Sequence, residues 1–337
     1  MAHYIITGAS GFLGNNLAQE LINRGHKVTI TLRTMKYLSA MYCRDAEVAY
    51  GDMRDKSFLS SLIKKDSIVI HCAGIMALGK ENKNLMFDIN YKATRDLTDV
   101  CIEKEAKKLI FISSVDAILH DKGSLEIIEP KTFEIDKLTT PYAKSKALAS
   151  KYVLDRAKEG RINANVVYPT CLIGPGDFKI SNIGEIILNY ANDKQVFNVK
   201  GGAYNFVDIR DVVDGIIKIS ETAPSGEDYI LGGNKTSLNN IFEILAENFG
   251  KKKPKQVSLF SALTKSFFIN IINQVLEHRN IYNTYYLKSF KGNHNFSSEK
   301  AKKTVGFKNR PIEESLSDAI SWYKENKKDL LTSPEKF

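Results

Sequence analysis

Short apolar runs alternate with longer segments of helical periodicity along the first half of the chain. The runs have the length of strands and occupy residues 3–7, 27–32, 46–50, 67–73, 108–113 and 163–168. After the first run, Leu13, Leu17 and Leu21 recur every four residues up to Arg24 and Gly25, a pair typical of a helix end. Strands that alternate with helices in this way favour βαβ units and a parallel sheet.

The pattern changes after Pro169. Residues 170–205 are rich in Gly and Asn and have weak periodicity. Regular elements follow, namely a strand leading into a helix at 206–222, a strand at 227–232, and helices at 237–249 and 312–325. We therefore expect a second, smaller domain whose chain crosses back to the first.

Residues 257–277 form an apolar segment that allows two interpretations. Lys251 to Lys255 and the pair His278-Arg279 flank it with positive charge, as in a helix that lies in a membrane interface. Polar residues interrupt it, so a lid or core helix beside a substrate cleft explains it as well, and we favour that interpretation. No run reaches the length of a membrane span, and the N-terminus has no features of a signal peptide.

Composition and charge narrow the class of protein and its partners. Hydrophobic residues make up 43% and charged residues 26%, as in ordinary globular proteins. The formal charge is +9, but the basic residues are scattered, so a solvated surface accounts for most of the excess, and we favour a small anionic molecule over nucleic acid as a partner. The four cysteines form no C-x-x-C pair and have no His at ligand spacing, which argues against a metal site and favours a reduced, cytoplasmic protein.

A glycine-rich turn follows the first predicted strand and opens the first predicted helix. Gly8 permits the tight turn, Gly11 lets the backbone approach a pyrophosphate, and Gly14 allows close packing of helix on strand. The helix N-terminus presents N–H groups and the positive end of its dipole to the phosphates. The pattern predicts a dinucleotide site that also includes Ser10, Phe12 and Leu13.

The end of the second predicted strand bears on which dinucleotide binds. An NAD site usually carries an Asp or Glu there to bind the ribose 2′-hydroxyl. This sequence has Arg33-Thr34-Met35-Lys36 instead, and a guanidinium can bind the 2′-phosphate of NADP through two charge-assisted hydrogen bonds. We therefore predict NADP(H) rather than NAD(H). The alternative is that Arg33 is only a solvated residue at a strand end.

Two further strand ends suit a dinucleotide site. Asp52 and Met53 follow the third predicted strand, where a carboxylate can accept a hydrogen bond from the adenine amine. Cys72, Ala73 and Gly74 end the fourth, and small residues there leave room for ribose and nicotinamide. Either segment alone is also compatible with an ordinary turn.

Tyr142 and Lys146 are candidates for proton chemistry. They are four residues apart, which places them on one face of a helix predicted to begin at Pro141. An ammonium beside a phenol favours the phenolate and lowers the phenol's pKa from its ordinary value of about 10. A hydride-transfer enzyme needs such an acid–base group at neutral pH. Lys146 can also reach the nicotinamide ribose.

Ser113 and Ser114 end the fifth predicted strand. Ligands of open α/β sheets bind beyond the carboxyl ends of the strands, so a hydroxyl there can polarise a substrate carbonyl. We assign this role to Ser114, with Ser113 as the alternative. Asn90, in a helix predicted at 85–105, is a candidate for a proton relay through water; the alternative is an asparagine that kinks the helix.

These motifs together resemble the extended short-chain dehydrogenase/reductase family, also called the NAD-dependent epimerase/dehydratase superfamily. The resemblance covers nearly the full chain and rests on motifs in the family's order, namely TGASGFLG, GDMRD, HCAG, DINYKAT, FISS, PYAKSK, VVYPTCLIGPGD and NFVDIRDVVDGI. It implies an α/β fold with a Rossmann-type, doubly wound parallel sheet as the NADP-binding domain, residues 1–169 with return segments about 206–232. A smaller C-terminal α/β substrate-binding domain comprises 170–205 and 233–337.

The resemblance also implies roles for individual residues. Ser114, Tyr142 and Lys146 correspond to the family's catalytic triad, and Pro169, Thr170 and Leu172 correspond to positions near the nicotinamide carboxamide. Family members often dimerise through the helices expected here at 85–105 and 142–159, so we expect a homodimer.

The residues after the catalytic serine bear on the subfamily. Val115 and Asp116 differ from the endings typical of sugar epimerases and of sugar dehydratases, although Asp116 keeps a dehydratase-like function open. With Arg33, they make the chain most similar to the dihydroflavonol 4-reductase-like branch, whose members reduce ketones or aldehydes with NADPH.

We therefore hypothesise an NADP(H)-dependent oxidoreductase that reduces a ketone or aldehyde of a small organic substrate. One alternative is a nucleotide-sugar epimerase or dehydratase that retains its NAD(P), and another is a non-catalytic NADP-sensing regulator. The substrate is expected at residues 170–205 and 255–295, where Asn182 and Tyr204 are candidates for contact or for packing.

Overall fold

Seven parallel strands form the larger sheet of the computed structural model, which describes residues 1–34, 45–76, 83–119, 125–275 and 284–327. The strands are β1 His3–Thr7, β2 Lys27–Leu32, β3 Glu47–Tyr50, β4 Ser67–His71, β5 Lys108–Ile112, β6 Ala164–Pro169 and β10 Asp228–Leu231. Their order is β10-β6-β5-β4-β1-β2-β3, in which the chain adds β2 and β3 on one side of β1 and then crosses over to add β4, β5, β6 and β10 on the other. All six apolar runs predicted in the first half are strands of this sheet, so the doubly wound, Rossmann-type fold is confirmed.

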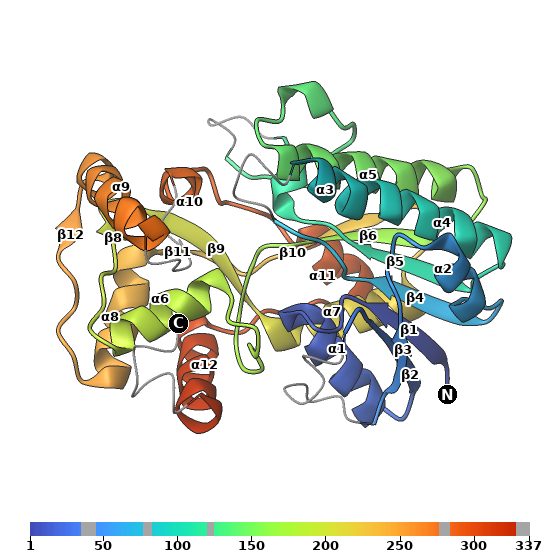
Figure 1. Ribbon diagram of the computed structural model, residues 1–337, viewed down its shortest axis with the longest axis horizontal. Helices are drawn as coiled ribbons and strands as arrows, with labels where there is room; N and C mark the ends of the chain where they lie inside the picture. The colour runs from blue at the N-terminus through green and yellow to red at the C-terminus, as the bar shows by residue number, and fades with distance from the viewer. Residues whose placement is uncertain (35–44, 77–82, 120–124, 276–283, 328–337) are drawn as a thin grey trace.

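Helices cover both faces of the large sheet (Figure 1). One face carries α2 Lys56–Leu62, α3 Lys83–Phe87, α4 Ala93–Glu103 and α5 Pro141–Lys158, and the other carries α1 Phe12–Asn23, α7 Ile209–Thr222 and α11 Glu299–Val305. Every residue of β4, β5 and β6 is buried, which explains why these strands are continuous apolar runs in the sequence. Burial of each Leu or Ile side chain there contributes about 1.5–3 kcal/mol.

Local sequence signals fix several helix ends. Helix α1 ends before Arg24, and Gly25 follows with a φ of 77°, a conformation that glycine adopts without strain. Helix α5 begins at Pro141. The preceding residue, Thr140, caps it, because the Thr140 side chain accepts a hydrogen bond from the backbone N–H of Ala143 at 3.1 Å. At the other end of the sheet, Lys108 of β5 donates to two carbonyls at the end of α7, those of Ile219 and Ala223.

A buried histidine joins two central strands to a covering helix. In His71, at the end of β4, Nδ1 lies 2.6 Å from Oγ1 of Thr7 in β1 and Nε2 lies 2.9 Å from Oγ1 of Thr94 in α4. Burial lowers the pKa of His71 to about 3, so the imidazole is neutral at physiological pH. His71 therefore has a structural role: it links β1, β4 and α4 just below the edge of the sheet at which β1 and β4 end.

The smaller domain has its own sheets and its own core. Its three-stranded sheet has the order β11-β9-β7, and β8 pairs with β12 as a short parallel pair. Its strands are β7 Cys171–Ile173, β8 Asn198–Val199, β9 Ala203–Asp208, β11 Asn234–Ser237 and β12 Gln256–Val257. Its helices are α6 Asn182–Ala191, α8 Leu238–Phe249, α9 Leu259–Val275, α10 Thr284–Ser289 and α12 Ile312–Asn326. The core of this domain is a separate cluster of buried side chains, and the prediction of a smaller C-terminal domain is confirmed.

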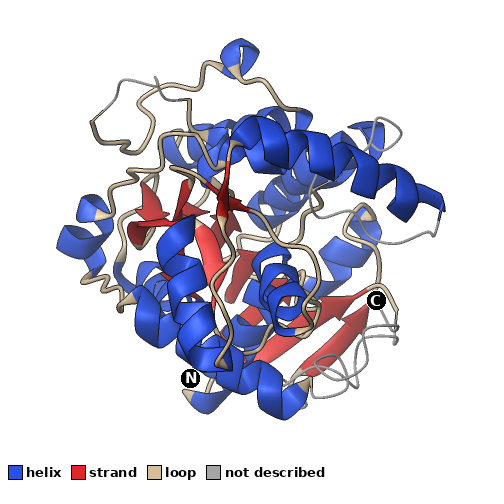
Figure 2. Ribbon diagram, turned by 90° about the vertical axis from the view of Figure 1, so that its left-hand side faces the viewer, coloured by secondary structure: helices blue, strands red, loops and turns tan. Residues whose placement is uncertain are grey.

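The chain crosses between the two domains more than once. After β9 in the small sheet, helix α7 packs on the large sheet and β10 adds to its edge. Helix α11, although late in the chain, packs against α7 and β10 and contributes Ala301 and Val305 to the core of the large sheet. Figure 2 shows the strands enclosed by helices. Within the described residues, no helix is long and apolar enough to cross a membrane.

Candidate active site

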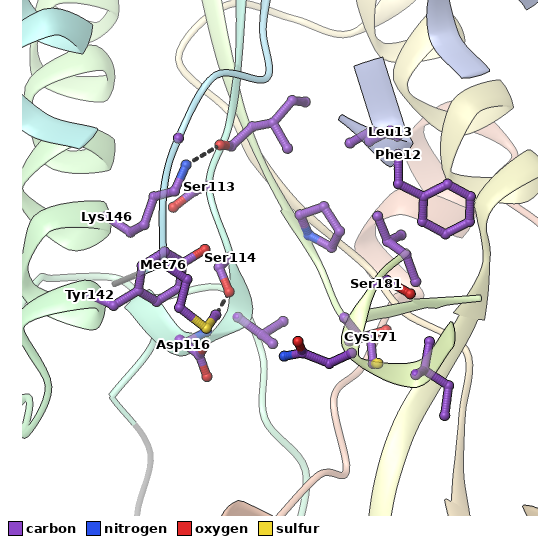
Figure 3. Close-up of a pocket in the computed structure, with 18 of the residues that line it drawn as sticks. Phe12, Leu13, Met76, Ser113, Ser114, Asp116, Tyr142, Lys146, Cys171 and Ser181 are labelled. Carbon is purple, nitrogen blue, oxygen red and sulfur yellow. Dashed lines mark hydrogen bonds between the residues drawn. The ribbon is translucent and has the colours of Figure 1, made fainter. Parts of the chain in front are cut away.

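A cavity of about 490 Å³ lies at the carboxyl edge of the large sheet, between that sheet and the smaller domain (Figure 3). On the sheet side it is lined by residues that follow β1, β4, β5 and β6 and by helix α5. Of the predicted site residues, those that line it are Phe12, Leu13, Cys72, Gly74, Ser114, Tyr142, Lys146, Pro169, Thr170 and Leu172. The fold thus brings together side chains that are more than 150 positions apart in the sequence.

Tyr142 and Lys146 both extend from α5 toward this cavity (Figure 3). The ammonium of Lys146 is buried and donates to the backbone oxygen of Ile112 at 2.8 Å, so its side chain is fixed against the end of β5. It also lies 4.9 Å from the centroid of the Phe111 ring. Burial lowers the pKa of Lys146 to about 8, which leaves the protonated form predominant at neutral pH.

The two serines at the end of β5 have different surroundings. Ser113 also lines the cavity but is buried, and its hydroxyl accepts a hydrogen bond from the Ser150 hydroxyl of α5 at 2.8 Å. Ser114 is half-buried at the cavity, and its hydroxyl accepts from the backbone N–H of Asp116 at 3.2 Å. That bond uses an acceptor position and leaves the hydroxyl hydrogen able to donate into the cavity. The geometry therefore favours Ser114 for holding a substrate oxygen.

Asn90 lies behind the cavity wall. The predicted helix at 85–105 is divided by a π-helical turn, Asp88–Lys92, that contains Asn90, so the interruption expected from the alternative interpretation is present. The Asn90 side chain donates to the Ile75 backbone oxygen and accepts from the Ile75 backbone nitrogen, both at 2.8 Å. It thereby positions the segment that carries Gly74. A proton relay through Asn90 stays a prediction.

The glycine turn has the geometry that a dinucleotide phosphate requires. Gly8 has a φ of 72°, and a Cβ there would lie 2.6 Å from the backbone nitrogen of Ala73. A Cβ on Gly14 would lie 2.6 Å from the Gly8 oxygen. Helix α1 begins after Gly11 with no side chain capping its N-terminal N–H groups. A phosphate can take that place, so this turn and the N-terminus of α1 fit the pyrophosphate of a dinucleotide.

The residues predicted to bind the adenosine half of the dinucleotide lie after β2 and β3. Arg33 is exposed directly after β2, whereas Met35 and Lys36 of the same run lie outside the described residues. Asp52, after β3, accepts hydrogen bonds from the Arg54 side chain and backbone nitrogen. Arg54, with Arg33 as a weaker neighbour, lowers the pKa of Asp52 to about 2. The Met53 side chain is buried, and its sulfur accepts from the Thr31 hydroxyl.

The smaller domain supplies the opposite wall of the cavity. Asn182 and Tyr204, named from the sequence as candidates for substrate contact, both line it. The other lining residues from this domain were not named individually; all but Phe206 lie in the ranges 170–205 and 255–295, where the substrate was expected, and they are Cys171, Ser181, Ile183, Phe206, Ser289 and Phe290. Met76 and Asp116, on the sheet side, also line the cavity. Asp116 had a signal in the sequence, since it follows Ser114 by two residues, whereas Ser181, Ile183, Ser289 and Phe290 lie in segments without a motif.

The sequence and the fold were compared with those of known proteins. Residues 4–232 match the NAD dependent epimerase/dehydratase family. Sterol demethylase protein B of Methylococcus capsulatus is 26% identical over 95% of this chain and 98% of that protein. A Synechocystis protein that carries the name of a dihydroflavonol 4-reductase is 26% identical over 95% and 94% of the two chains. The crystal structure of gox2253 superposes with a TM-score of 0.80 at 27% identity, over 96% of this chain and 98% of that one.

Substitution of Gly8 tests the close approach between the glycine turn and the segment after β4. Gly8→Ala adds a methyl group to a left-handed residue that is already in contact with the Ala73 backbone. Gly25→Ala is the matched control, because Gly25 has a φ of 77° and nothing within 4 Å of the added methyl group. We expect Gly25→Ala to cost about 1 kcal/mol of unfolding free energy.

Gly8→Ala is expected to cost at least about 2 kcal/mol more than that control and to weaken dinucleotide binding. Urea unfolding and cofactor titration of both variants measure the two effects. Equal destabilisation by the two substitutions would contradict the close approach.

Proposed function

The chain belongs to the NAD-dependent epimerase/dehydratase family, and we propose that it is an NADP(H)-dependent oxidoreductase that reduces a ketone or aldehyde of a small organic substrate. Two observations support this within the family. Ser114, Tyr142 and Lys146 line one cavity, and few charged side chains are found among its described lining residues. The relatives named as reductases agree with it. The proposal includes a homodimer through α4 and α5, as the family resemblance implies.

Each catalytic side chain has one task in the proposed reaction. NADPH, when bound, would supply the hydride to the carbonyl carbon. The Tyr142 hydroxyl donates a proton to the carbonyl oxygen, while the Ser114 hydroxyl holds that oxygen by a hydrogen bond. Lys146, one helical turn along α5 from Tyr142, stabilises the phenolate that remains. Its hydrogen bond to Ile112 keeps the ammonium in place during this step.

The charge of the cavity is the observation that carries the choice of substrate class. Among the described lining residues, Lys146 and Asp116 are the only Lys, Arg, Asp or Glu side chains. Burial raises the pKa of the Cys171 thiol to about 12, so it is neutral. A nucleotide sugar carries a pyrophosphate that needs cations or convergent N–H donors at its binding site. A cavity with apolar walls and no guanidinium fits an uncharged carbonyl compound better.

A dehydratase or epimerase with a retained cofactor is the second candidate. Asp116 favours it, because this carboxylate lines the cavity two residues from Ser114 and is placed to act as a further acid or base. Among the described lining residues Lys146 is the only cationic side chain, and its ammonium is bonded to the Ile112 oxygen, which argues against the pyrophosphate of a nucleotide sugar as part of the substrate.

The preference for NADP(H) rests on the charges around the predicted 2′-phosphate position. Arg54 is paired with the Asp52 carboxylate and has Asp88, itself paired with Lys92, as a weaker acidic neighbour. Arg33 is exposed and takes part in none of these pairs, so its guanidinium suits a phosphate dianion better than a neutral ribose hydroxyl.

Tyr142→Phe removes the proposed proton donor and retains the ring. We expect turnover to fall by at least about 100-fold, the usual contribution of a positioned acid, with NADPH affinity nearly unchanged. Tyr152→Phe is the matched control, since Tyr152 is on the same helix with its hydroxyl bonded to Asp99 at 2.6 Å. Steady-state kinetics with a panel of aldehydes and ketones and a cofactor titration give both quantities. Retention of most activity by Tyr142→Phe would rule out its role.

Arg33→Ala tests the choice of cofactor. We expect the wild type to bind NADPH at least about 10-fold more tightly than NADH, a difference of about 1.4 kcal/mol, and the variant to lose that preference. Lys27→Ala removes a positive charge at the other end of β2 and should preserve it. Fluorescence titration of both cofactors measures the ratio. Equal binding of NADH and NADPH by the wild type would show that Arg33 does not select the cofactor.

A further inference from the structure

Helix α9 has apolar side chains on two opposite faces. Ala262 and Ser266 are buried, and Leu259, Leu263 and Ile269 are partly buried against the core of the smaller domain. The predicted helix is thus present and takes part in a core. None of the α9 side chains that the structure describes, those up to Ile269, lines the cavity.

The opposite face of α9 carries three exposed phenylalanines. Phe260, Phe267 and Phe268 are 77%, 62% and 64% exposed. With Thr264 they have the spacing i, i+4, i+7 and i+8, which places them on one face of the helix. The Thr264 hydroxyl donates to the Phe260 backbone oxygen at 2.7 Å and so adds little polarity to this face. We call these four residues the phenylalanine face.

Isolated exposed apolar residues are ordinary, but a cluster of large aromatic side chains on one helix face is not. The Phe267 and Phe268 rings contact each other with centroids 5.7 Å apart in an edge-to-face arrangement. In Figure 1, α9 lies at the outer end of the smaller domain, away from the large sheet. The exposure of its three phenylalanine side chains leaves this face free to meet an extended surface.

The stretch of sequence that contains this face is strongly basic. Residues 250–298 contain seven lysines and one arginine but a single acidic residue, Glu277, and therefore hold most of the net charge of +9. Lys252, Lys255 and Lys265 are exposed and make no ion pair within the part of the chain that the structure describes. Lys265 lies on α9 itself, between the phenylalanine face and the buried face.

We propose that the phenylalanine face docks on the surface of an anionic lipid bilayer. The rings would enter the boundary between headgroups and acyl chains, and lysines of the same basic segment, with Lys265 on α9 itself, would contact the anionic headgroups. Peripheral binding of this kind needs no spanning helix. Charge complementarity favours a bilayer over a second copy of this chain, because two copies would bring the same basic segments together.

Docking at this face would place the cavity close to the lipid. Helix α10 packs against α9, and Ser289 and Phe290 at its end line the cavity. An apolar carbonyl compound dissolved in the bilayer would thus have a short route to the active site. The docking itself does not depend on the proposed reaction.

Flotation with vesicles tests the proposal. The purified wild type is mixed with vesicles of phosphatidylcholine alone, or with about 30% phosphatidylserine. We expect binding to the anionic vesicles to exceed that to the neutral ones by at least about 10-fold and to decrease as salt is added. The combined variant Phe260→Ser, Phe267→Ser and Phe268→Ser should lose at least about 10-fold in binding to anionic vesicles.

Two controls separate docking from other effects. Leu125→Ser with Ile128→Ser removes exposed apolar side chains elsewhere, 91% and 54% exposed, and should leave binding unchanged. Lys252→Glu, Lys255→Glu and Lys265→Glu together should abolish the preference for anionic vesicles. Circular dichroism and turnover of a water-soluble carbonyl should be the same in the serine variant as in the wild type, which makes this test independent of the reductase proposal.

Several results would overturn the proposal. One is a wild type that floats with neither kind of vesicle, or a serine variant that binds as well as the wild type. Another is self-association that the serine substitutions abolish in analytical ultracentrifugation without lipid, which would show that a second copy covers the face. Tight binding of a single-stranded RNA that the same substitutions remove would assign the face to nucleic acid instead.

Discussion

All seven strands of the large sheet run in the same direction, and the position of every candidate catalytic residue depends on this constraint. Because the carboxyl ends of β1, β4, β5 and β6 meet at one edge, residues far apart in the sequence face one cavity. At its narrowest point the edge leaves no space for a side chain, since a Cβ on Gly8 would lie 2.6 Å from the Ala73 nitrogen. His71, beneath this point, links β1, β4 and α4.

The two domains contribute different chemistry to the site. The large sheet and α5 supply the polar groups, above all Tyr142, Lys146 and Ser114, and each is fixed by helix or strand-end hydrogen bonds rather than by a long loop. The smaller domain supplies mainly apolar and aromatic walls, including Phe206 and Phe290. In the proposed reaction the first set handles the proton and the cofactor, and the second set recognises the substrate. Relatives with different substrates can share the first set while differing in the second.

The strands and the glycine turn could be predicted from the sequence because their physical requirements restrict which residues can occupy them. A strand buried on both faces must be a continuous apolar run, and the glycine turn must lack side chains where two backbones meet. The lining of the cavity by Phe206 and Phe290 has no such signal, because these contacts exist only after distant segments have packed. Likewise, the packing of α11 against α7 joins two helices far apart in the sequence, and no local pattern indicates such a pairing. In α9 both faces are apolar, so periodicity could not indicate which one is buried.

The central claim is that hydride passes from NADPH to an external carbonyl compound, and isotope transfer tests it most directly. The enzyme would be incubated with NADPH carrying deuterium at the reactive carbon of the nicotinamide and with a panel of aldehydes and ketones, and the products analysed by mass spectrometry. The account predicts an alcohol that carries one deuterium from the cofactor, formed in step with NADPH oxidation. Release of an epimerised or dehydrated product, with the cofactor still bound and its label not transferred to an external carbonyl, would contradict it.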